Sequence, residues 1–336
     1  MRRSHTETIL VSGLVTGLAG LALVLALAPL GRTFDALRQI WPVWAIAAPL
    51  ATLVVLRSRH RWAPIIAALA TLAILAPGIG ETVRSWRGLA PVAGAEPTGP
   101  IEISIATHNM WGRSASPEAA VEILPPLAPD VLALQEASAS ARYASEALVR
   151  RYSYSARCRS TRLLTRFEIL DSGCIAPPEN IDWQTAIPCD WEVPPAVWAR
   201  VRLPDGTETT LVSVHLTWPF PGPTQSCQRA NLGRALALLP QERMIVMGDF
   251  NAAAPSYALK RLERDLGLER RSIAIATFPA EGRFQAAGWG TPPLPPMLVG
   301  IDHIFAGEDW ATVSIGTGPN TGSDHRPLIA TLRLAD

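Results

Sequence analysis

The chain has 336 residues, 48 % of them hydrophobic and 18 % charged, and its formal net charge is +1. This length is enough for a large core, and the hydrophobic share is high for a wholly soluble protein. Residues 101–336 carry 21 Lys and Arg against 25 Asp and Glu, a net charge of −4. They therefore lack the basic excess that is typical of a nuclease that holds duplex DNA by its phosphates.

Three apolar runs near the start of the chain account for the high hydrophobic share. Residues 8–30 contain no charged side chain, and 40–56 and 62–80 are similarly apolar. Crossing the hydrocarbon core takes about 20 residues, with roughly 17 as the lower limit, so the first and third runs qualify and the second is marginal. We therefore expect a membrane anchor of three transmembrane helices within residues 1–80. The alternatives are a cleaved signal peptide for the first run and buried helices of a soluble domain.

Arginines on the short flanks predict how these helices are oriented. Arg2 and Arg3 precede the first run, and three further arginines lie between the second and third, at positions 57, 59 and 61. The positive-inside rule places both flanks in the cytoplasm, and an odd number of spans then places everything after residue 80 outside. Arginines on the opposite flanks, at positions 32, 38, 84 and 87, weaken this prediction. We expect a multi-pass protein of the cell (inner) membrane with a periplasmic or extracellular domain.

All four cysteines lie in the part of the chain that is expected outside the cytoplasm. An even count there is compatible with two disulfides, for which three pairings exist. Cys158 with Cys174 and Cys189 with Cys227 is the expected pairing, because each bond closes a modest loop. Buried free thiols are the alternative, and the wide spacings do not resemble a zinc site.

A linker with turn-forming composition is expected over residues 81–100, and strands and helices alternate in the domain that follows, over 101–336. Alternating or continuous apolar patterns predict strands over 101–107, 129–136, 196–203, 209–214, 244–247, 301–305 and 328–332, and a hairpin around 161–166. Amphipathic patterns predict helices from 116 onward and over 137–151, 228–239 and 257–267. The Cys- and Pro-rich stretch 171–195 is expected to be irregular, and 292–296 to form a Pro-rich loop.

Polar side chains stand at one end of almost every predicted strand. They lie at or just past the strand end in most cases, and only Asp302 begins its strand; the set is Asn109, Glu136, His215, Asp249, Asn251, Asp302, Asp324 and His325. In a sandwich of two sheets such ends converge on one rim and form a site. Each residue alone has an ordinary alternative as a turn, cap or strand-end residue. Their occurrence together, in this order, favours a functional site.

The donor set indicates phosphate chemistry. Carboxylate and carboxamide oxygens suit a hard cation such as Mg²⁺ or Mn²⁺ rather than zinc. Such an ion neutralises the charge on phosphate oxygens during in-line attack, and a histidine paired with an aspartate can donate hydrogen bonds to the phosphoryl group. The composition of the site therefore predicts a metal-dependent phosphoesterase.

The motifs also resemble a known family. Thr-His-Asn, Leu-Gln-Glu, Val-His-Leu, Gly-Asp-Phe-Asn, Ile-Asp-His-Ile and Ser-Asp-His-Arg-Pro, in this order over about 101–334, are similar to those of the endonuclease/exonuclease/phosphatase superfamily. That family includes deoxyribonuclease I, abasic-site endonucleases, neutral sphingomyelinases and inositol polyphosphate 5-phosphatases. The resemblance implies an α/β (α+β) four-layer sandwich, in which two mixed β-sheets are flanked by helices.

The resemblance also implies a role for each residue. Glu136 would be the main metal anchor, with Asn109 at the metal and Asp324 a further carboxylate near this ion or a second one. Asp249 would orient or deprotonate the attacking water, and Asn251 would hold a phosphate oxygen.

His325, held by Asp302, would contact the phosphate, and His215 resembles the histidine of the deoxyribonuclease and sphingomyelinase branches. Abasic-site endonucleases carry a carboxylate where this chain has Trp111 and a tyrosine in place of His215, which argues against abasic-site repair.

The leading hypothesis is thus a membrane-anchored, divalent-metal-dependent phosphoesterase on the outer face of a membrane. Its substrate is a phosphodiester or phosphomonoester, and the anchor slightly favours a lipid headgroup. Two alternatives stay open: an extracytoplasmic endo- or exonuclease, and a non-catalytic, membrane-tethered binding module.

Overall fold

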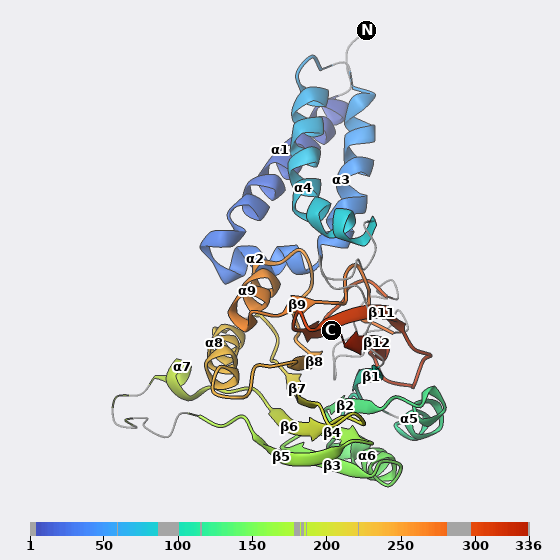
Figure 1. Ribbon diagram of the computed structural model, residues 1–336. Helices are drawn as coiled ribbons and strands as arrows, with labels where there is room; N and C mark the ends of the chain where they lie inside the picture. Colours follow the sequence, from blue (N-terminus) through green and yellow to red (C-terminus); the bar gives the residue numbers. More distant parts are fainter. Residues whose placement is uncertain are drawn as a thin grey trace.

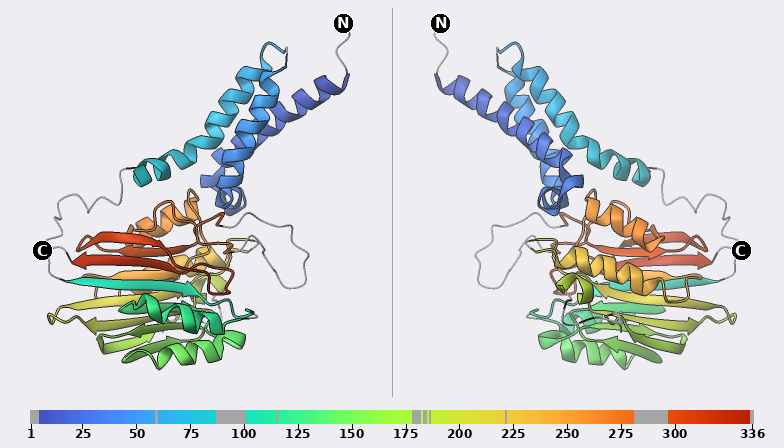
Figure 2. Two further views of the ribbon diagram at one scale, coloured as in Figure 1. Left: turned by 90° about the vertical axis from the view of Figure 1, so that its right-hand side faces the viewer. Right: turned by 90° about the vertical axis from the view of Figure 1, so that its left-hand side faces the viewer.

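A computed structural model describes residues 5–334, apart from 59, 87–100, 115, 178–181, 183, 184, 186, 221 and 281–296. A bundle of helices stands on one end of a β-sandwich (Figures 1 and 2). The helices come from the first 86 residues and the sandwich from residues 102–334. The expected division into an apolar N-terminal part and one large domain therefore corresponds to two visibly different structures.

The sandwich consists of two six-stranded mixed sheets. The first has the order β11-β12-β1-β2-β4-β3, with β1 (Glu102–Asn109), β2 (Val131–Gln135), β3 (Tyr154–Cys158), β4 (Thr161–Thr165), β11 (Trp310–Thr317) and β12 (Leu328–Leu334). The second has the order β5-β6-β7-β8-β10-β9, with β5 (Glu168–Cys174), β6 (Ala196–Arg202), β7 (Glu208–His215), β8 (Ile245–Asp249), β9 (Glu269–Arg270) and β10 (Asp302–Ala306). Only the pairs β1–β2 and β7–β8 are parallel among the paired strands of the described chain.

Helices cover the outer face of each sheet, which gives the expected four layers. α5 (Glu118–Ile123) and α6 (Arg142–Val149) pack on the first sheet, and α8 (Thr224–Leu236) and α9 (Tyr257–Leu266) on the second. The central strands are apolar on both faces because they serve two cores. In β1, Ile103 and Ile105 enter the core between the sheets, whereas Ala106 enters the core beneath the helices.

The predicted strands and helices occur at the expected places, and several further elements of the described chain were not expected. β5, β9 and β11 were not expected, and the first of them makes residues 171–174 a regular edge strand rather than part of an irregular stretch. β5 pairs with β6 from Glu168 to Cys174 with one irregularity between Ile169 and Asp171, so its strand structure comes from a neighbour that is distant in sequence. A short helix, α7 (Pro188–Trp191), also interrupts that stretch. The Pro-rich segment 292–296 lies outside the described residues.

Both disulfides have the expected pairing. Cys158 and Cys174 join β3 to β5, which are the outermost strands of the two sheets, so this bond closes the sandwich at one edge. Cys189 and Cys227 join α7 to α8. The edge that the first disulfide closes lies farthest from the N-terminal helices (Figure 1).

The N-terminal part contains α1 (His5–Ala26), α2 (Arg32–Gln39), α3 (Trp41–Leu56) and α4 (Ala63–Trp86). Two helices in the described chain, over Thr6–Ala26 and Ala63–Ser85, are long and apolar enough to cross a membrane. α3 is shorter, and it joins α2 at a bend of 76°, so a third span is present only if this pair is counted as one. Three transmembrane helices therefore stay a prediction.

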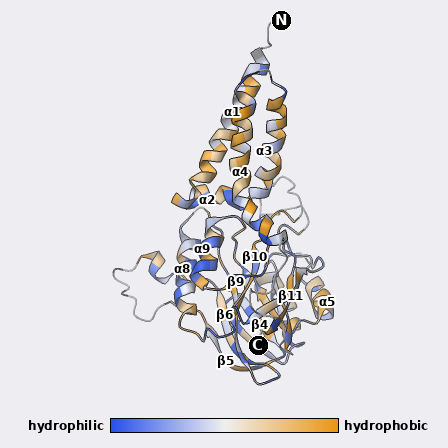
Figure 3. Ribbon diagram, turned by 45° about the horizontal axis from the view of Figure 1, so that its top comes forward, coloured by the Kyte–Doolittle hydropathy of each residue, from blue (hydrophilic) through white to orange (hydrophobic). Residues whose placement is uncertain are grey.

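Large apolar side chains point outward along these helices, as expected for surfaces in contact with lipid. Figure 3 shows hydrophobic residues along α1, α3 and α4, and the exposed ones include Ile9, Leu23, Ile46, Leu53, Leu69 and Leu72. The start of α1 and the α3–α4 connection lie at the end of the bundle away from the sandwich (Figure 1). This arrangement agrees with an odd number of crossings before the large domain.

Polar contacts hold the helices against the sandwich. α4 continues to Trp86, so residues 81–86 are helical and are not part of the linker that we expected. The reason is that this last part of α4 is bound by the large domain: Glu81 accepts from both terminal nitrogens of Arg270, at 2.9 and 2.7 Å. At the base of the bundle, Asp35 of α2 accepts from the backbone N–H of Tyr257 and Ala258, at 2.7 and 2.8 Å.

Candidate active site

The eight polar residues that were predicted at strand ends meet at one rim of the sandwich. The strand pairing explains why. Residues Asn109 and Gln135 pair at the ends of the parallel strands β1 and β2, and His215 pairs with Asp249 at the ends of β7 and β8. β10 runs antiparallel to β8, so its first residue, Asp302, pairs with Asp249. A residue that begins a strand thus reaches the same rim as residues that end theirs.

Asn109 links the two sheets at this rim. Its Nδ2 donates to Glu136 Oε1 at 3.2 Å and to Asp249 Oδ2 at 2.9 Å, and its Oδ1 accepts from Trp111 N at 2.8 Å. Glu136 also accepts from Gly112 N at 2.8 Å. These bonds hold one carboxylate from each sheet on either side of a single amide group.

Asp302 and His325 form a buried pair. His325 Nδ1 lies 2.8 Å from Asp302 Oδ2, which also accepts from Thr277 Oγ1 at 2.6 Å. Burial alone would lower the pKa of His325, but Asp302 and Asp249 raise it to about 10. Burial would likewise raise the pKa of Asp302, but its bonds to the histidine and the threonine keep it below the usual range. The pair is therefore an imidazolium beside a carboxylate at neutral pH.

Asp249 lies at the centre of the site and is 1 % exposed. Its Oδ2 is 3.8 Å from His325 Nε2 and 3.6 Å from His215 Nε2. Complete burial raises the pKa of this carboxyl, although the positive charge of His325 opposes the shift. A carboxylate with a raised pKa is a better proton acceptor near neutral pH than an ordinary aspartate.

Asn251 supports Asp249 from the following loop. Its backbone N–H donates to Asp249 Oδ1 at 2.9 Å, and its Nδ2 donates to Leu216 O at 2.8 Å and more weakly to Asp249 Oδ2 at 3.3 Å. Its Oδ1 is buried and has no hydrogen-bond partner within the described chain.

Asp324 approaches the same space from the turn before β12. Its Oδ1 is buried without a hydrogen bond to any described residue. Burial raises the pKa of Asp324 to about 6, and the negative charges of Glu136 and Asp249 add to the increase despite His325. These three carboxylates therefore face one another across the site.

The backbone at the rim is unusual in ways that position these groups. Gly248 has φ +151°, and a Cβ atom there would lie 1.9 Å from Val214 O, so only glycine lets β8 approach β7 this closely. Glu136 and Asn251 have φ of +50° and +46°. Left-handed backbone is uncommon for such residues and is concentrated at functional sites.

Comparison with known proteins agrees with this geometry. The Endonuclease/Exonuclease/phosphatase family matches residues 106–325, which is more than half of the chain. The chain belongs to this family. Its members are in general hydrolases that act on phosphate esters and use a divalent metal ion. No curated protein matches the chain.

Solved structures show the same fold. A family protein from Bacteroides vulgatus is 18 % identical, with a TM-score of 0.54 over 70 % of this chain and 99 % of its own. One from Beutenbergia cavernae is 17 % identical, with a TM-score of 0.52 over 70 % of this chain and 72 % of its own. Truncated TDP2 from Caenorhabditis elegans is 14 % identical, with a TM-score of 0.51 over 71 % of this chain and all of its own, 100 %. At these identities the likeness concerns the fold alone.

A divalent metal ion fits the carboxylates of this family member. Asp249, Asp302 and His325 offer ligand atoms within 4.8 Å of one another. Two of these atoms, however, are already joined by the 2.8 Å bond between His325 Nδ1 and Asp302 Oδ2, so this group is better explained as an acid–base pair beside Asp249. Glu136 and Asp324 also face the site, and within the described chain neither has a cationic partner at a distance as short as 2.8 Å. Asp324 Oδ1 has no hydrogen bond there, so it suits a metal ion.

Several functional neighbours were not expected from the sequence. Thr277 orients Asp302, and its segment carries no motif. Ser323 donates to Asn109 O at 2.7 Å and accepts from His325 N at 3.1 Å, so it ties the turn before β12 to the end of β1. Because Ser323 begins the motif Ser-Asp-His-Arg-Pro, the sequence could have indicated that it belongs to the site. Gln225 Nε2 donates to the backbone oxygens of Phe250 and Asn251, at 3.2 and 2.8 Å, and so holds the loop after β8.

Proposed function

We propose that the chain is a membrane-anchored phosphoesterase that hydrolyses a phosphate ester on the outer face of a membrane and depends on Mg²⁺ or Mn²⁺. The observation that supports this most is the meeting of Asp249, the Asp302–His325 pair and two further carboxylates at the rim shared by both sheets. Membership of the family supplies the reaction class.

Each side chain has a proposed role in attack by water on phosphorus. Asp249 orients the water and takes its proton, which its buried position favours. His325, kept protonated by Asp302, donates from Nε2 to a phosphoryl oxygen, and Asn251 holds another. The partly exposed His215, whose Nε2 lies 3.6 Å from Asp249 Oδ2, is proposed to protonate the leaving oxygen.

Glu136 and Asp324 are proposed as the metal ligands, with Asn109 beside them. Asn109 holds Glu136 in place, and its Oδ1 keeps a second lone pair for the ion. The bound ion would neutralise charge on the phosphate oxygens as the water attacks. Oxygen donors of this kind favour Mg²⁺ or Mn²⁺ over zinc.

The experiment uses the full-length chain in nanodiscs, because the helices and the large domain share contacts. Bis-(p-nitrophenyl) phosphate should be hydrolysed with Mg²⁺ or Mn²⁺ and not with EDTA. Asp249→Asn and His325→Ala should each lose most of the activity, whereas the matched variant Asp205→Asn, in an exposed turn, should keep it. Metal-independent turnover, or none on any phosphate ester, would refute the proposal, and the latter would favour a binding module.

The outer-face location is supported by two disulfides and by the arginine distribution. A reporter that is active only in the periplasm, fused to the C-terminus, should be active. A reporter that works only in the cytoplasm should be silent at the same position. The opposite pair of results would reverse the topology while leaving the chemistry in place. Preferential hydrolysis of DNA or RNA would support the nuclease alternative.

A further inference from the structure

An apolar cavity connects the active site with the membrane helices. It has a volume of about 240 Å³ and lies between the α2–α3 junction and the rim of the sandwich. Hydrophobic side chains form most of its wall, and the only amides among them come from Gln39 and Asn251 in the described chain. Asn251 belongs to the active site and Gln39 ends α2, so the cavity has the proposed reaction centre on one side and the membrane part on the other.

On the active-site side, aromatic rings continue from the site into the cavity wall. The ring of Phe278 lies 5.0 Å from the imidazole of His325, and the ring of Trp218 meets Phe278 edge-on at 6.0 Å. Both aromatic residues line the cavity. A phosphate bound at the histidine would therefore have hydrocarbon surface immediately beside it.

On the membrane side, the cavity reaches the bend between α2 and α3. Ile40, at this bend, lines the cavity and is 37 % exposed. The next residue, Trp41, donates its indole N–H to Ile74 O of α4 at 3.0 Å, and it packs where Gly78 leaves room, since a Cβ there would lie 2.2 Å from its ring. The bend is therefore held firmly to the apolar bundle. Indole rings such as that of Trp41 favour the lipid–water boundary, so this bend suits a position at that boundary.

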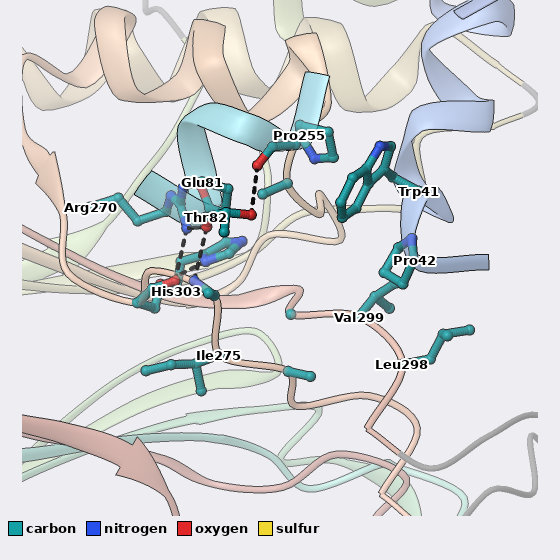
Figure 4. Close-up of a pocket in the computed structure, with 16 residues that line it drawn as sticks. Trp41, Pro42, Glu81, Thr82, Pro255, Arg270, Ile275, Leu298, Val299 and His303 are labelled. Carbon is teal, nitrogen blue, oxygen red and sulfur yellow. Dashed lines mark hydrogen bonds and ion pairs between the residues drawn. The ribbon is translucent and has the colours of Figure 1, made fainter. Parts of the chain in front are cut away.

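A neighbouring cavity of about 210 Å³ shares Leu298 and Val299 with the first but has a different character. Figure 4 shows Glu81 and Arg270 close together at its wall, with Thr82 and His303 nearby, and two hydrogen bonds of 2.9 and 2.7 Å join the pair. Its charged groups are already paired with one another. Of the two cavities, only the first offers a continuous apolar wall beside the phosphate chemistry.

We propose that the apolar cavity binds the first part of the hydrocarbon chain of a membrane-lipid phosphate ester, which enters from the outer leaflet. This inference rests on the proposed function and adds the substrate class. The volume is below the roughly 300–1,000 Å³ of sites for whole drug-sized ligands, so the cavity takes part of a chain while the rest stays in the bilayer. Trp218, 51 % exposed, extends the apolar wall toward solvent.

The test compares p-nitrophenyl alkyl phosphodiesters with one to eight carbons in the alkyl chain, using the full-length protein in nanodiscs. Each buried methylene contributes about 0.8 kcal/mol, so kcat/KM should rise up to roughly four-fold per carbon until the cavity is full. Val299→Asn and Leu298→Asn should flatten this rise when the rate of each variant is expressed relative to its own rate on the methyl ester. Val313→Asn on β11, 47 % exposed and not among the residues that line the cavity, is the matched control and should keep the rise in rate with chain length.

The outcomes separate this inference from the proposed function. Longer esters also partition into the bilayer, but this effect is equal for every variant. The measurement is therefore the difference between variants in the slope of kcat/KM against chain length. Equal slopes in the wild type and both cavity variants would overturn the lipid-chain inference, even with the methyl ester hydrolysed. If the slopes are equal and the cavity variants also change their oligomeric state, the lipid-chain inference is overturned and this wall is instead an interface between copies of the chain. No hydrolysis of the methyl ester by the wild type would refute the proposed function itself.

Discussion

Arg270 joins the N-terminal helices to the large domain through two bonds to Glu81, and replacing it should loosen that link. Its side chain is 3 % exposed and donates to Glu81 of α4 at 2.9 and 2.7 Å and to Glu263 of α9 at 2.6 Å. A further N–H reaches Ser272 O at 2.8 Å. Arg270→Met keeps most of the side-chain volume but leaves Glu81 without this cationic partner, while Glu263 keeps only its longer contact to Arg84, at 3.3 Å.

The cost follows from the burial of the partners. Removing one member of a buried ion pair costs about 3–5 kcal/mol, because the remaining charge stays desolvated. The two glutamates keep some contact with water, so the lower end of this range, about 3 kcal/mol, is expected. For a domain of this size that corresponds to a fall of roughly 6–12 °C in Tm. Arg270→Lys should recover only part, since an ammonium cannot bind Glu81 through two parallel bonds.

Thermal unfolding followed by tryptophan fluorescence in nanodiscs measures this loss. Arg202→Met is the matched control, because its 2.7 Å pair with Glu168 is exposed, at 46 % and 51 %, and exposed pairs contribute about 0–1 kcal/mol. The double variant Glu81→Gln, Arg270→Met should be less destabilised than the sum of the single variants. Hydrogen exchange at Ala274, whose N–H donates to Glu81 at 2.9 Å, should accelerate in Arg270→Met. A loss no larger than that of the control would refute this account of the interface.

Three further predictions concern the site, a disulfide and pH. Asp302→Asn should reduce kcat by about 100-fold or more and move the alkaline limb of the pH–rate profile to lower pH, because the pKa of His325 loses its main support. Replacing Cys158 and Cys174 together by serine should cost about 3 kcal/mol in the free energy of unfolding, measured with denaturant, because the bond closes a loop of 16 residues. Burial lowers the pKa of His303 to about 4 from 6.5, so the unfolded chain binds its proton first as the pH falls. Stability that is present above pH 6.5 should be lost toward pH 4, by up to about 3 kcal/mol, and His303→Gln should flatten this part of the profile.

The rim of the sandwich could be predicted from the sequence because its residues follow recognisable apolar runs. Asn109 and Asp249 each end a strand, and a shared strand direction is enough to bring such ends together. Their partners were not predictable in the same way. Thr277 reaches Asp302 from a segment without a motif, and Phe278 gains its place only through the fold.

The same reasoning explains why two strands and the end of one helix were not predicted. β5 and β11 are edge strands with exposed positions, so their apolar pattern is weak and their regularity comes from pairing with β6 and β12. The last part of α4 was expected in a linker because residues 81–100 as a whole have a turn-forming composition, although 81–86 themselves carry charged residues instead. Those charges are the ones that Arg270 and Glu263 bind, which no local pattern in the sequence indicates.

The docking of α2 on the large domain also affects how the protein meets its substrate. Asp35 caps the start of α9 while Arg38 of the same short helix donates to Leu25 O of α1, at 3.0 and 2.7 Å. If the N-terminal helices span a membrane, as we propose, the proposed reaction centre is held at a constant height above the bilayer and cannot sweep through the surrounding solution. For a lipid substrate, encounter becomes a two-dimensional search, and the rate should follow the mole fraction of the lipid in the membrane rather than its bulk concentration.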